Sequence, residues 1–266
     1  MESQLHPIQN MHPKDLKPLL DTYFKNYTLE PMLGGGTDAK LFSINIENGN
    51  DFVVKIQEQS LRNEYLNYQF LAGKVPVPRV QFYTSWQNHD ILCMTKIKGQ
   101  TLDSQRHEAN PSDIVRQYAH ALKLLHAIPI QNAPVWQNIQ EKVMEAGIRI
   151  KENLVDIDDF EKENRDMSCE DLYKKLSSNI PQKTELVFTH GDYCLDNVLF
   201  DASGLTGFID MGRGGIADKY QDIALAVRSI RDEYSEDFLS LFFEKYGLSA
   251  VSYDKIDFYI LLDEFF

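Results

Sequence analysis

Hydrophobic and polar side chains alternate along the first third of the chain in the manner of β-strands. Residues 29–56 contain two extended runs on either side of Asn48-Gly49, a pair that favours tight β-hairpins, and the alternation is clearest over residues 41–46. Residues 60–74 change to helical spacing, with apolar or aromatic side chains three and four positions apart and a glycine near the end. Strand character returns over residues 75–99. The pattern predicts a sheet accompanied by one helix.

Helical spacing dominates the chain from about residue 98 onward. Asn110-Pro111 is a strong helix start, because an asparagine side chain caps free backbone N–H groups and proline fits the first turn. Apolar side chains then recur along one face of the predicted helix. A β-rich segment followed by an α-rich segment predicts an α+β fold. We expect a β-rich N-terminal lobe over residues 1–97 and a mainly helical C-terminal lobe over residues 98–266.

The charge balance narrows the possible partners. The chain has 27 basic and 40 acidic side chains, a net charge of −13. This argues against nucleic acid, whose phosphates need a basic footprint, and suits a cationic ligand. The three cysteines form neither a disulfide framework nor a metal pattern, and no stretch resembles a signal peptide or a membrane span. We expect a cytoplasmic protein with no membrane partner, and the sequence indicates no particular oligomeric state.

One segment of the C-terminal half carries the chemistry. Asp192 precedes Asn197 by five positions, and Asp210 follows thirteen positions later, at the end of a predicted hairpin of strands 198–200 and 206–210. Phosphoryl transfer needs a carboxylate that orients and deprotonates the attacking hydroxyl, and it needs oxygen ligands for Mg²⁺. We predict Asp192 as the catalytic base and Asn197 with Asp210 as metal ligands. Such residues are also common in turns, but three in this order and context favour the catalytic interpretation.

Protein kinases carry the corresponding motifs His-Arg-Asp-x4-Asn and Asp-Phe-Gly. The two-lobed pattern and this motif together predict a protein-kinase-like fold. Here Gly191 stands in place of the arginine, and Met211 stands in place of the phenylalanine. Loss of that arginine removes the group that reads a phosphorylated activation loop. We therefore expect activity that does not depend on phosphorylation of the protein itself.

Two residues upstream complete the catalytic set. Lys55 lies among apolar residues of a predicted strand, where a charge is costly to bury without a partner, and Glu64 on the following helix is the natural partner. We predict that this pair binds the phosphates of ATP. Taken alone, Lys55 is better explained as a charge at a strand edge, and Glu64 as a solvated helix residue. Together with the downstream motif, the nucleotide interpretation becomes the better one.

A glycine-rich turn and the predicted lobe connector supply further nucleotide contacts. Gly34–Gly36 and Thr37 lie in the first predicted hairpin, where backbone N–H groups without a nearby Cβ can approach phosphates. The run matches no complete phosphate-binding motif, so a plain turn is an equal alternative. We predict Gly36 and Thr37 as ATP-binding residues, and backbone groups at Met94 and Ile97 as the adenine contacts.

Five segments carry a resemblance that goes beyond the general fold. They are HGDYCLDN (190–197), GFIDMGR (207–213), ADKYQDIA (217–224), VRSIR (227–231) and LLDEFF (261–266). Together they resemble the aminoglycoside 3'-phosphotransferases, densely over residues 188–266 and more loosely over residues 30–130. The resemblance implies that ATP, with Mg²⁺, phosphorylates the 3'-hydroxyl of kanamycin- or neomycin-type drugs and so confers resistance.

The same resemblance implies which residues bind the cationic drug, because several ammonium groups need several carboxylates. They are acidic residues of the C-terminal lobe, the terminal carboxylate, and two arginines that contact hydroxyls or organise the carboxylates: Asp158, Asp159, Glu161, Glu163, Asp232, Asp263, Glu264, Phe266, Arg213 and Arg228. A solvated helix face is the alternative for residues 158–163. The apolar ending LLDEFF is expected to dock.

Two alternative functions remain at this point. A related kinase that phosphorylates a macrolide, choline, homoserine or an amino sugar would share the catalytic motif. A pseudokinase, which binds without catalysis, would share the fold. The acidic segments favour a polycation over the first group. The presence of Lys55, Asp192 and Asp210 argues against the second.

Overall fold

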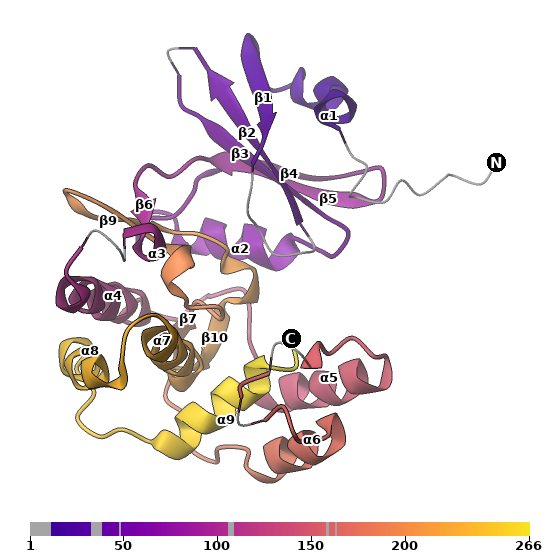
Figure 1. Cartoon of the computed structure of the whole chain (residues 1–266). Helices are drawn as coiled ribbons and strands as arrows, with labels where there is room; N and C mark the ends of the chain where they lie inside the picture. Colours follow the sequence, from indigo (N-terminus) through magenta and orange to yellow (C-terminus); the bar gives the residue numbers. More distant parts are fainter. Residues whose placement is uncertain (1–11, 33–38, 48, 106–108, 158–159, 163) are drawn as a thin grey trace.

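The computed structural model describes residues 12–32, 39–47, 49–105, 109–157, 160–162 and 164–266. The first part is a five-stranded antiparallel sheet in the order β1-β2-β3-β5-β4, and helix α2 lies between this sheet and the helical part of the molecule (Figure 1). The elements are α1 (Pro13–Leu20), β1 (Tyr27–Pro31), β2 (Ala39–Ile46), β3 (Phe52–Gln57), α2 (Arg62–Leu71), β4 (Val80–Trp86) and β5 (His89–Thr95). The predicted hairpin and helix are confirmed, whereas α1 was not predicted.

Alternation along β2 and β3 separates the two faces of the sheet. Phe42 and Ile44 of β2 and Val54 and Ile56 of β3 are at most 1% exposed, and they pack with the apolar residues of α1. Side chains one position along a strand point to the opposite face. Lys55 therefore projects away from α1 and lines the large cavity described below.

The second part of the molecule is mainly helical (Figure 1). Its helices are α3 (Leu102–Gln105), α4 (Pro111–His126), α5 (Ile139–Lys151), α6 (Cys169–Ser178), α7 (Tyr220–Glu233), α8 (Leu239–Tyr246) and α9 (Tyr253–Asp263), with short 3₁₀ turns η3 (Leu195–Asn197), η4 (Met211–Arg213) and η5 (Glu236–Phe238). Helix α4 begins as predicted, because the Asn110 side chain accepts a hydrogen bond of 2.9 Å from the Ser112 N–H. Within the described part of the chain, no helix is long and apolar enough to cross a membrane.

The second part of the molecule also contains short strands. They are β6 (Gln100–Thr101), β7 (Leu186–Thr189), β8 (Val198–Asp201), β9 (Gly204–Phe208) and β10 (Gly215–Asp218). These strands form two small sheets, β10-β7 and β6-β8-β9. Strand β9 ends at Phe208, although the sequence predicted a strand as far as Asp210. The physical reason is the backbone of Asp210, whose φ of 58° and ψ of 54° lie in the left-handed region that a strand cannot contain.

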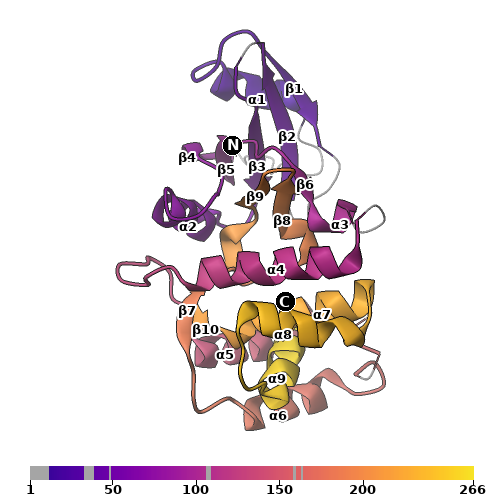
Figure 2. The same ribbon diagram turned by 90° about the vertical axis from the view of Figure 1, so that its left-hand side faces the viewer.

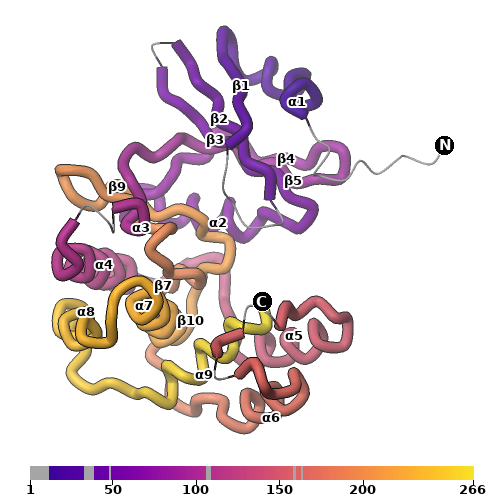
Figure 3. Tube along the Cα trace, viewed as in Figure 1, coloured from indigo at the N-terminus to yellow at the C-terminus, as the bar shows by residue number. Residues whose placement is uncertain are grey.

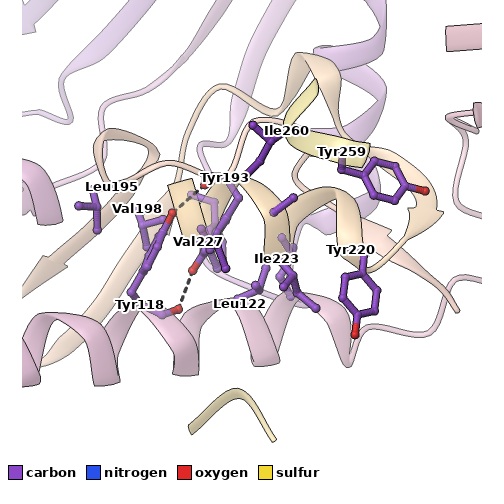
Figure 4. Close-up of a cluster of buried hydrophobic side chains, with 14 of the residues drawn as sticks. Tyr118, Leu122, Tyr193, Leu195, Val198, Tyr220, Ile223, Val227, Tyr259 and Ile260 are labelled. Atoms are coloured by element: carbon purple, nitrogen blue, oxygen red, sulfur yellow. Dashed lines mark hydrogen bonds between the residues drawn. The ribbon is translucent and has the colours of Figure 1, made fainter. Parts of the chain in front are cut away.

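The core of the helical part surrounds α4 and α7. Helix α4 crosses the molecule, with β6, β8 and β9 on one side and α7 and α8 on the other (Figure 2). Tyr118 of α4 stacks on Tyr193 at a ring distance of 4.5 Å, and each hydroxyl donates to the other's carbonyl oxygen, at 2.6 and 2.7 Å (Figure 4). Ile223 and Val227 of α7 are fully buried in the same cluster. This packing fixes the segment that follows β7.

Candidate active site

The loop that follows β7 is held by buried hydrogen bonds from the helical core. Asp222 of α7 is fully buried and accepts from the backbone N–H groups of His190, at 2.7 Å, and Gly191, at 2.8 Å. Gly191 has a φ of +85°, and a Cβ at this position would lie 1.9 Å from the carbonyl oxygen of Arg213. Glycine is therefore required where protein kinases have arginine, because the chain passes too close to η4 for any side chain.

Asp192 emerges from this loop into the cleft. The Asn197 side-chain amide donates to the Asp192 Oδ2 at 3.1 Å and to its backbone carbonyl at 2.9 Å. These bonds fix the orientation of the carboxylate, and among the described residues we find no hydrogen-bond donor to Oδ1. A carboxylate held in this way can accept a hydrogen bond, and then a proton, from a hydroxyl in the cleft.

Lys55, Glu64 and Asp210 form one group on the other side of the cleft. The Lys55 Nζ lies 2.8 Å from Glu64 Oε2 and 2.7 Å from Asp210 Oδ1. The side chains of Lys55 and Glu64 are 10% and 1% exposed, whereas Asp210 is 47% exposed and open to the cavity. Burial alone would lower the pKa of Lys55, but the two carboxylates outweigh it and raise the pKa, so the ammonium keeps its proton.

A cavity of about 510 Å³ joins these groups. The predicted site residues that line it are Lys55, Glu64, Met94, Ile97, Asp192, Asp210, Arg213 and Phe266. Leu41, Val53 and Ile209 add apolar walls. The apolar walls of the cavity suit the flat base of a nucleotide, and its charged end, at Lys55 and Asp210, suits the phosphates. Two further ATP-binding predictions, Gly36 and Thr37, lie outside the described residues.

Asp263 forms ion pairs with Arg213 and Arg228, the two arginines that were predicted as drug-site residues. Arg213 donates to one carboxylate oxygen, and Arg228 donates to the other at 2.6 Å. The Asp263 side chain is only 12% exposed. Burial alone would raise the pKa of this carboxyl, but the two guanidinium groups hold it below its usual value. Both oxygens of the Asp263 carboxylate thus already accept a hydrogen bond from within the protein.

Glu264 also bonds inside the protein. Its carboxylate accepts from the Glu161 N–H at 2.8 Å and from the Asn164 side-chain amide at 2.8 and 3.0 Å. Glu264 therefore ties the segment around Glu161 to the C-terminal tail, while the side chain of Glu161 is half-buried. Asp232 is exposed on the last turn of α7 and does not line the cavity. The predicted residues Asp158, Asp159 and Glu163 lie outside the described part of the chain.

The C-terminal tail is docked, as its apolar sequence suggested. The chain ends beside α5 (Figure 3). Phe265 is fully buried, and Phe266 is 38% exposed at the mouth of the cavity. Arg149 of α5 donates to the Phe265 carbonyl at 2.6 Å and to a terminal oxygen of Phe266 at 3.4 Å. Sequence reasoning missed Arg149, because its two partners in the tail lie more than a hundred residues away.

Two residues of α2 also escaped the sequence analysis. Asn67 donates to the backbone carbonyls of Met211, at 2.8 Å, and Gly214, at 3.0 Å, and Tyr68 contacts Asp210. Both lie three or four positions after Glu64, so helical spacing places them on the same side of α2. That spacing is the sequence signal that could have found them.

The fold and the cleft define a phosphotransferase with a kinase-like architecture, and the comparisons with known proteins agree. A family model described as "Phosphotransferase enzyme family" matches residues 31–259, so the chain belongs to this family. An aminoglycoside 3'-phosphotransferase of Niallia circulans is 39% identical over 209 residues, which are 78% of this chain and 79% of the relative. An aminoglycoside 3'-phosphotransferase of Enterococcus faecalis is 32% identical over 262 residues, 94% and 98% of the two chains. Within the family, the chain groups with the aminoglycoside 3'-phosphotransferases.

Solved structures support the same grouping. The crystal structure of an aminoglycoside 3'-phosphotransferase of type VIII superposes with a TM-score of 0.82 at 28% identity, covering 95% of this chain and 98% of that one. An aminoglycoside phosphotransferase of Streptomyces rimosus, solved in complex with ADP and streptomycin, has a TM-score of 0.78 at 24% identity, covering 94% and 98%. The second likeness concerns the fold alone. The predicted fold class and family resemblance are confirmed.

Proposed function

We propose that the protein transfers the γ-phosphoryl group of ATP to the 3'-hydroxyl of an aminoglycoside of the kanamycin or neomycin type and thereby confers resistance. The observation that carries the proposal is the cavity lined by Asp192, whose carboxylate Asn197 holds, and by the Lys55–Glu64–Asp210 group on the other side. The names of the relatives from Niallia circulans and Enterococcus faecalis support the choice of acceptor.

The nucleotide would occupy the part of the cavity between the sheet and Asp210. We infer that the Lys55 ammonium, fixed by Glu64, contacts the α- and β-phosphates, and that the adenine packs between the apolar walls near Met94 and Ile97. Gly36 and Thr37 remain candidates for phosphate contacts. ADP is bound in the related Streptomyces rimosus structure, which is consistent with a nucleotide in a cleft of this fold.

The residues of this end of the cavity fit Mg²⁺. Asp210 is 47% exposed, and the Ile209 N–H donates to the Asn197 carbonyl at 3.1 Å, so the two proposed ligand residues come from adjoining backbone segments. Carboxylate and amide oxygens are the donors that Mg²⁺ prefers. Bound there, Mg²⁺ would neutralise charge between the phosphates. Asp210 and Asn197 would hold it, and Lys55 would keep the Asp210 carboxylate directed into the cleft.

Asp192 carries the proton transfer in this proposal. Its carboxylate accepts a hydrogen bond from the 3'-hydroxyl and orients the oxygen toward the γ-phosphorus. A bond forms between that oxygen and the phosphorus, the bond from phosphorus to the β–γ bridging oxygen breaks, and ADP leaves. The hydroxyl proton passes to Asp192. Asn197 stabilises the reactive orientation, because its amide holds Oδ2 and leaves Oδ1 for the hydroxyl.

The drug would lie on the acidic C-terminal side of the cleft. A polyamine needs several carboxylates, and the net charge of −13 attracts cations to the surface. We propose that Glu161, Asp232 and the terminal carboxylate of Phe266 contact ammonium groups, together with Asp158, Asp159 and Glu163. Their internal bonds suggest that Asp263 and Glu264 act mainly by holding Arg213, Arg228 and the segment around Glu161 in place.

Two further proposals concern the organisation and location of the protein. We infer an N-terminal lobe over residues 1–97 and a C-terminal lobe over residues 98–266, since the large sheet ends at Thr95 and β6 already pairs with β8 of the helical part. We also propose a cytoplasmic location, where ATP and the ribosomal targets of these drugs are found.

The replacement Asp192→Ala tests the catalytic assignment. It should remove transfer to kanamycin while leaving equilibrium binding of ADP largely unchanged, because Asp192 contacts the acceptor rather than the nucleotide. Asp196→Ala is a matched control, since Asp196 is exposed in the same loop. Purified variants are compared by label transfer from ATP and by calorimetric ADP binding, and cells by kanamycin resistance. Normal resistance in the Asp192→Ala strain would show that another group is the base.

A further inference from the structure

The hydroxyl of Tyr68 lies between two residues of the nucleotide site. It donates to Glu64 Oε1 at 3.1 Å and accepts from the backbone N–H of Asp210 at 2.9 Å. Its side chain is 1% exposed. One buried oxygen atom therefore connects α2, which carries the partner of Lys55, to the turn that carries Asp210.

The direction of each of these two hydrogen bonds is fixed by the group that Tyr68 contacts. A backbone N–H can only donate, and a carboxylate without its proton can only accept, so the Tyr68 hydroxyl must accept from Asp210 and donate to Glu64. Burial, reinforced by the charge of Glu64, raises the pKa of Tyr68, so the hydroxyl keeps the proton that it donates. Without this hydroxyl, the partly buried N–H of Asp210 and the buried carboxylate oxygen of Glu64 would both lose a partner, and such groups are costly to leave unpaired.

The turn at Asp210 needs such support. Its φ of 58° is unusual for a residue other than glycine and costs about 1 kcal/mol. Asn67, next to Tyr68 on α2, donates to the carbonyls of Met211 and Gly214, at 2.8 and 3.0 Å. Tyr68 and Asn67 thus hold both ends of the segment from Asp210 to Gly214. Helix α2 imposes the backbone conformation that directs Asp210 into the cavity.

We propose that Tyr68 is a positioning residue that ties the Lys55–Glu64 pair to Asp210 and keeps the nucleotide side of the cleft assembled. This inference rests on the proposed function, because it assigns Tyr68 a role in the same reaction. A fixed link of this kind would let the site assemble without a phosphorylated activation loop. Both hydrogen bonds of the Tyr68 hydroxyl go to residues of the nucleotide side, Glu64 and Asp210.

The test is Tyr68→Phe, which removes the hydroxyl and keeps the buried ring. Tyr83→Phe is the matched control, because the Tyr83 hydroxyl also donates to a carboxylate, Asp90 Oδ2 at 2.6 Å, while Tyr83 lies on β4 and does not line the cavity. The kcat for kanamycin should fall about 10- to 100-fold in Tyr68→Phe, with KM for kanamycin within about 2-fold of the wild type. Tyr83→Phe should change neither constant by more than about 2-fold.

A binding measurement makes the result independent of turnover. Calorimetric titration with ADP, in the presence and absence of Mg²⁺, should show that Mg²⁺ strengthens ADP binding several-fold less in Tyr68→Phe than in the wild type. Equal strengthening, with an unchanged kcat in a folded variant, would overturn the inference. If Tyr68→Phe does not fold, the same ADP titrations are made with Asn67→Ala, which releases the other end of the segment from Asp210 to Gly214. A weaker effect of Mg²⁺ on ADP binding in that variant would support the inference, and an unchanged effect would overturn it. A wild type that leaves kanamycin unmodified would refute the proposed function, while the ADP titrations would still decide the role of Tyr68.

Discussion

Replacement of Asp263 by asparagine distinguishes a structural carboxylate from a drug-binding one. In the structure, both Asp263 oxygens accept from arginines, and the side chain is 12% exposed. Asparagine keeps the size of the side chain but removes its charge. Arg213 and Arg228 would then face each other without a neutralising carboxylate between them. We therefore expect a loss of stability as well as a loss of order in the drug site.

The size of the expected stability loss depends on how deeply Asp263, Arg213 and Arg228 are buried. Removing one partner of a buried ion pair costs about 3–5 kcal/mol. Arg213 and Arg228 are 39% and 27% exposed, so water compensates part of the loss. We expect a decrease of about 2–3 kcal/mol in the free energy of unfolding. At about 2–4 °C per kcal/mol for a chain of this size, Tm should fall by roughly 4–12 °C.

The assay is calorimetric unfolding of the wild type and Asp263→Asn at several pH values. The pKa of Asp263 is lowered in the folded state, so its stabilising contribution is present above the ordinary value of 3.8 and is lost as pH falls through the lower folded value. The difference in Tm between the two proteins should therefore shrink in acid. Asp232→Asn, at an exposed position on α7, is the control and should leave Tm within about 1 °C. An unchanged Tm combined with a large rise in KM for kanamycin would refute the structural role of Asp263.

Three further predictions follow from individual positions. Gly191→Ala should abolish activity and lower Tm strongly, because its Cβ would lie 1.9 Å from a backbone oxygen, whereas Gly204→Ala, with no atom within 4 Å, should cost only about 1 kcal/mol in chemical unfolding. Burial, reinforced by the charge of a neighbouring arginine, lowers the pKa of Lys142 to about 8, so Lys142→Met should be the more stable protein at pH 7 in urea unfolding. The stability advantage of Lys142→Met should shrink between pH 8 and 10.5, because over this range the folded wild type has lost the Lys142 proton that the unfolded chain retains. A difference in unfolding free energy that stays constant over this range would contradict the lowered pKa of Lys142. Arg149→Gln should raise KM for kanamycin several-fold and leave KM for ATP unchanged in steady-state assays, because it releases the terminal carboxylate of Phe266; equal changes in both constants would speak against this role.

Sequence reasoning succeeded where the signal is local. Strand alternation and the Asn-Gly pair predicted the β2–β3 hairpin. The spacing of Asp192, Asn197 and Asp210 singled out two residues that line one cavity, Asp192 and Asp210, and a third, Asn197, that donates to Asp192. Both patterns depend on neighbours in the chain. Helix α1 was missed, although Leu16 and Leu20 are spaced as a buried helix face requires.

The remaining features depend on contacts between distant segments. The sequence identified Asp263 as an acidic residue of the tail, but its arginine partners lie 35 and 50 positions away, so its neutralisation could not be read from the local pattern. Tyr68 looked like an ordinary apolar residue of a helix. Its role became visible only when the fold placed the Asp210 N–H against its hydroxyl.

The most direct test of the central claim compares kanamycin with its 3'-deoxy analogue. The purified protein is incubated with labelled ATP and Mg²⁺, and initial rates of transfer to each drug are measured, with Asp192→Ala as the catalytic control. We predict rapid transfer to kanamycin, with the phosphate located on the 3'-oxygen by NMR, and no transfer to the analogue above the Asp192→Ala background. Comparable transfer to the 3'-deoxy drug would contradict this prediction.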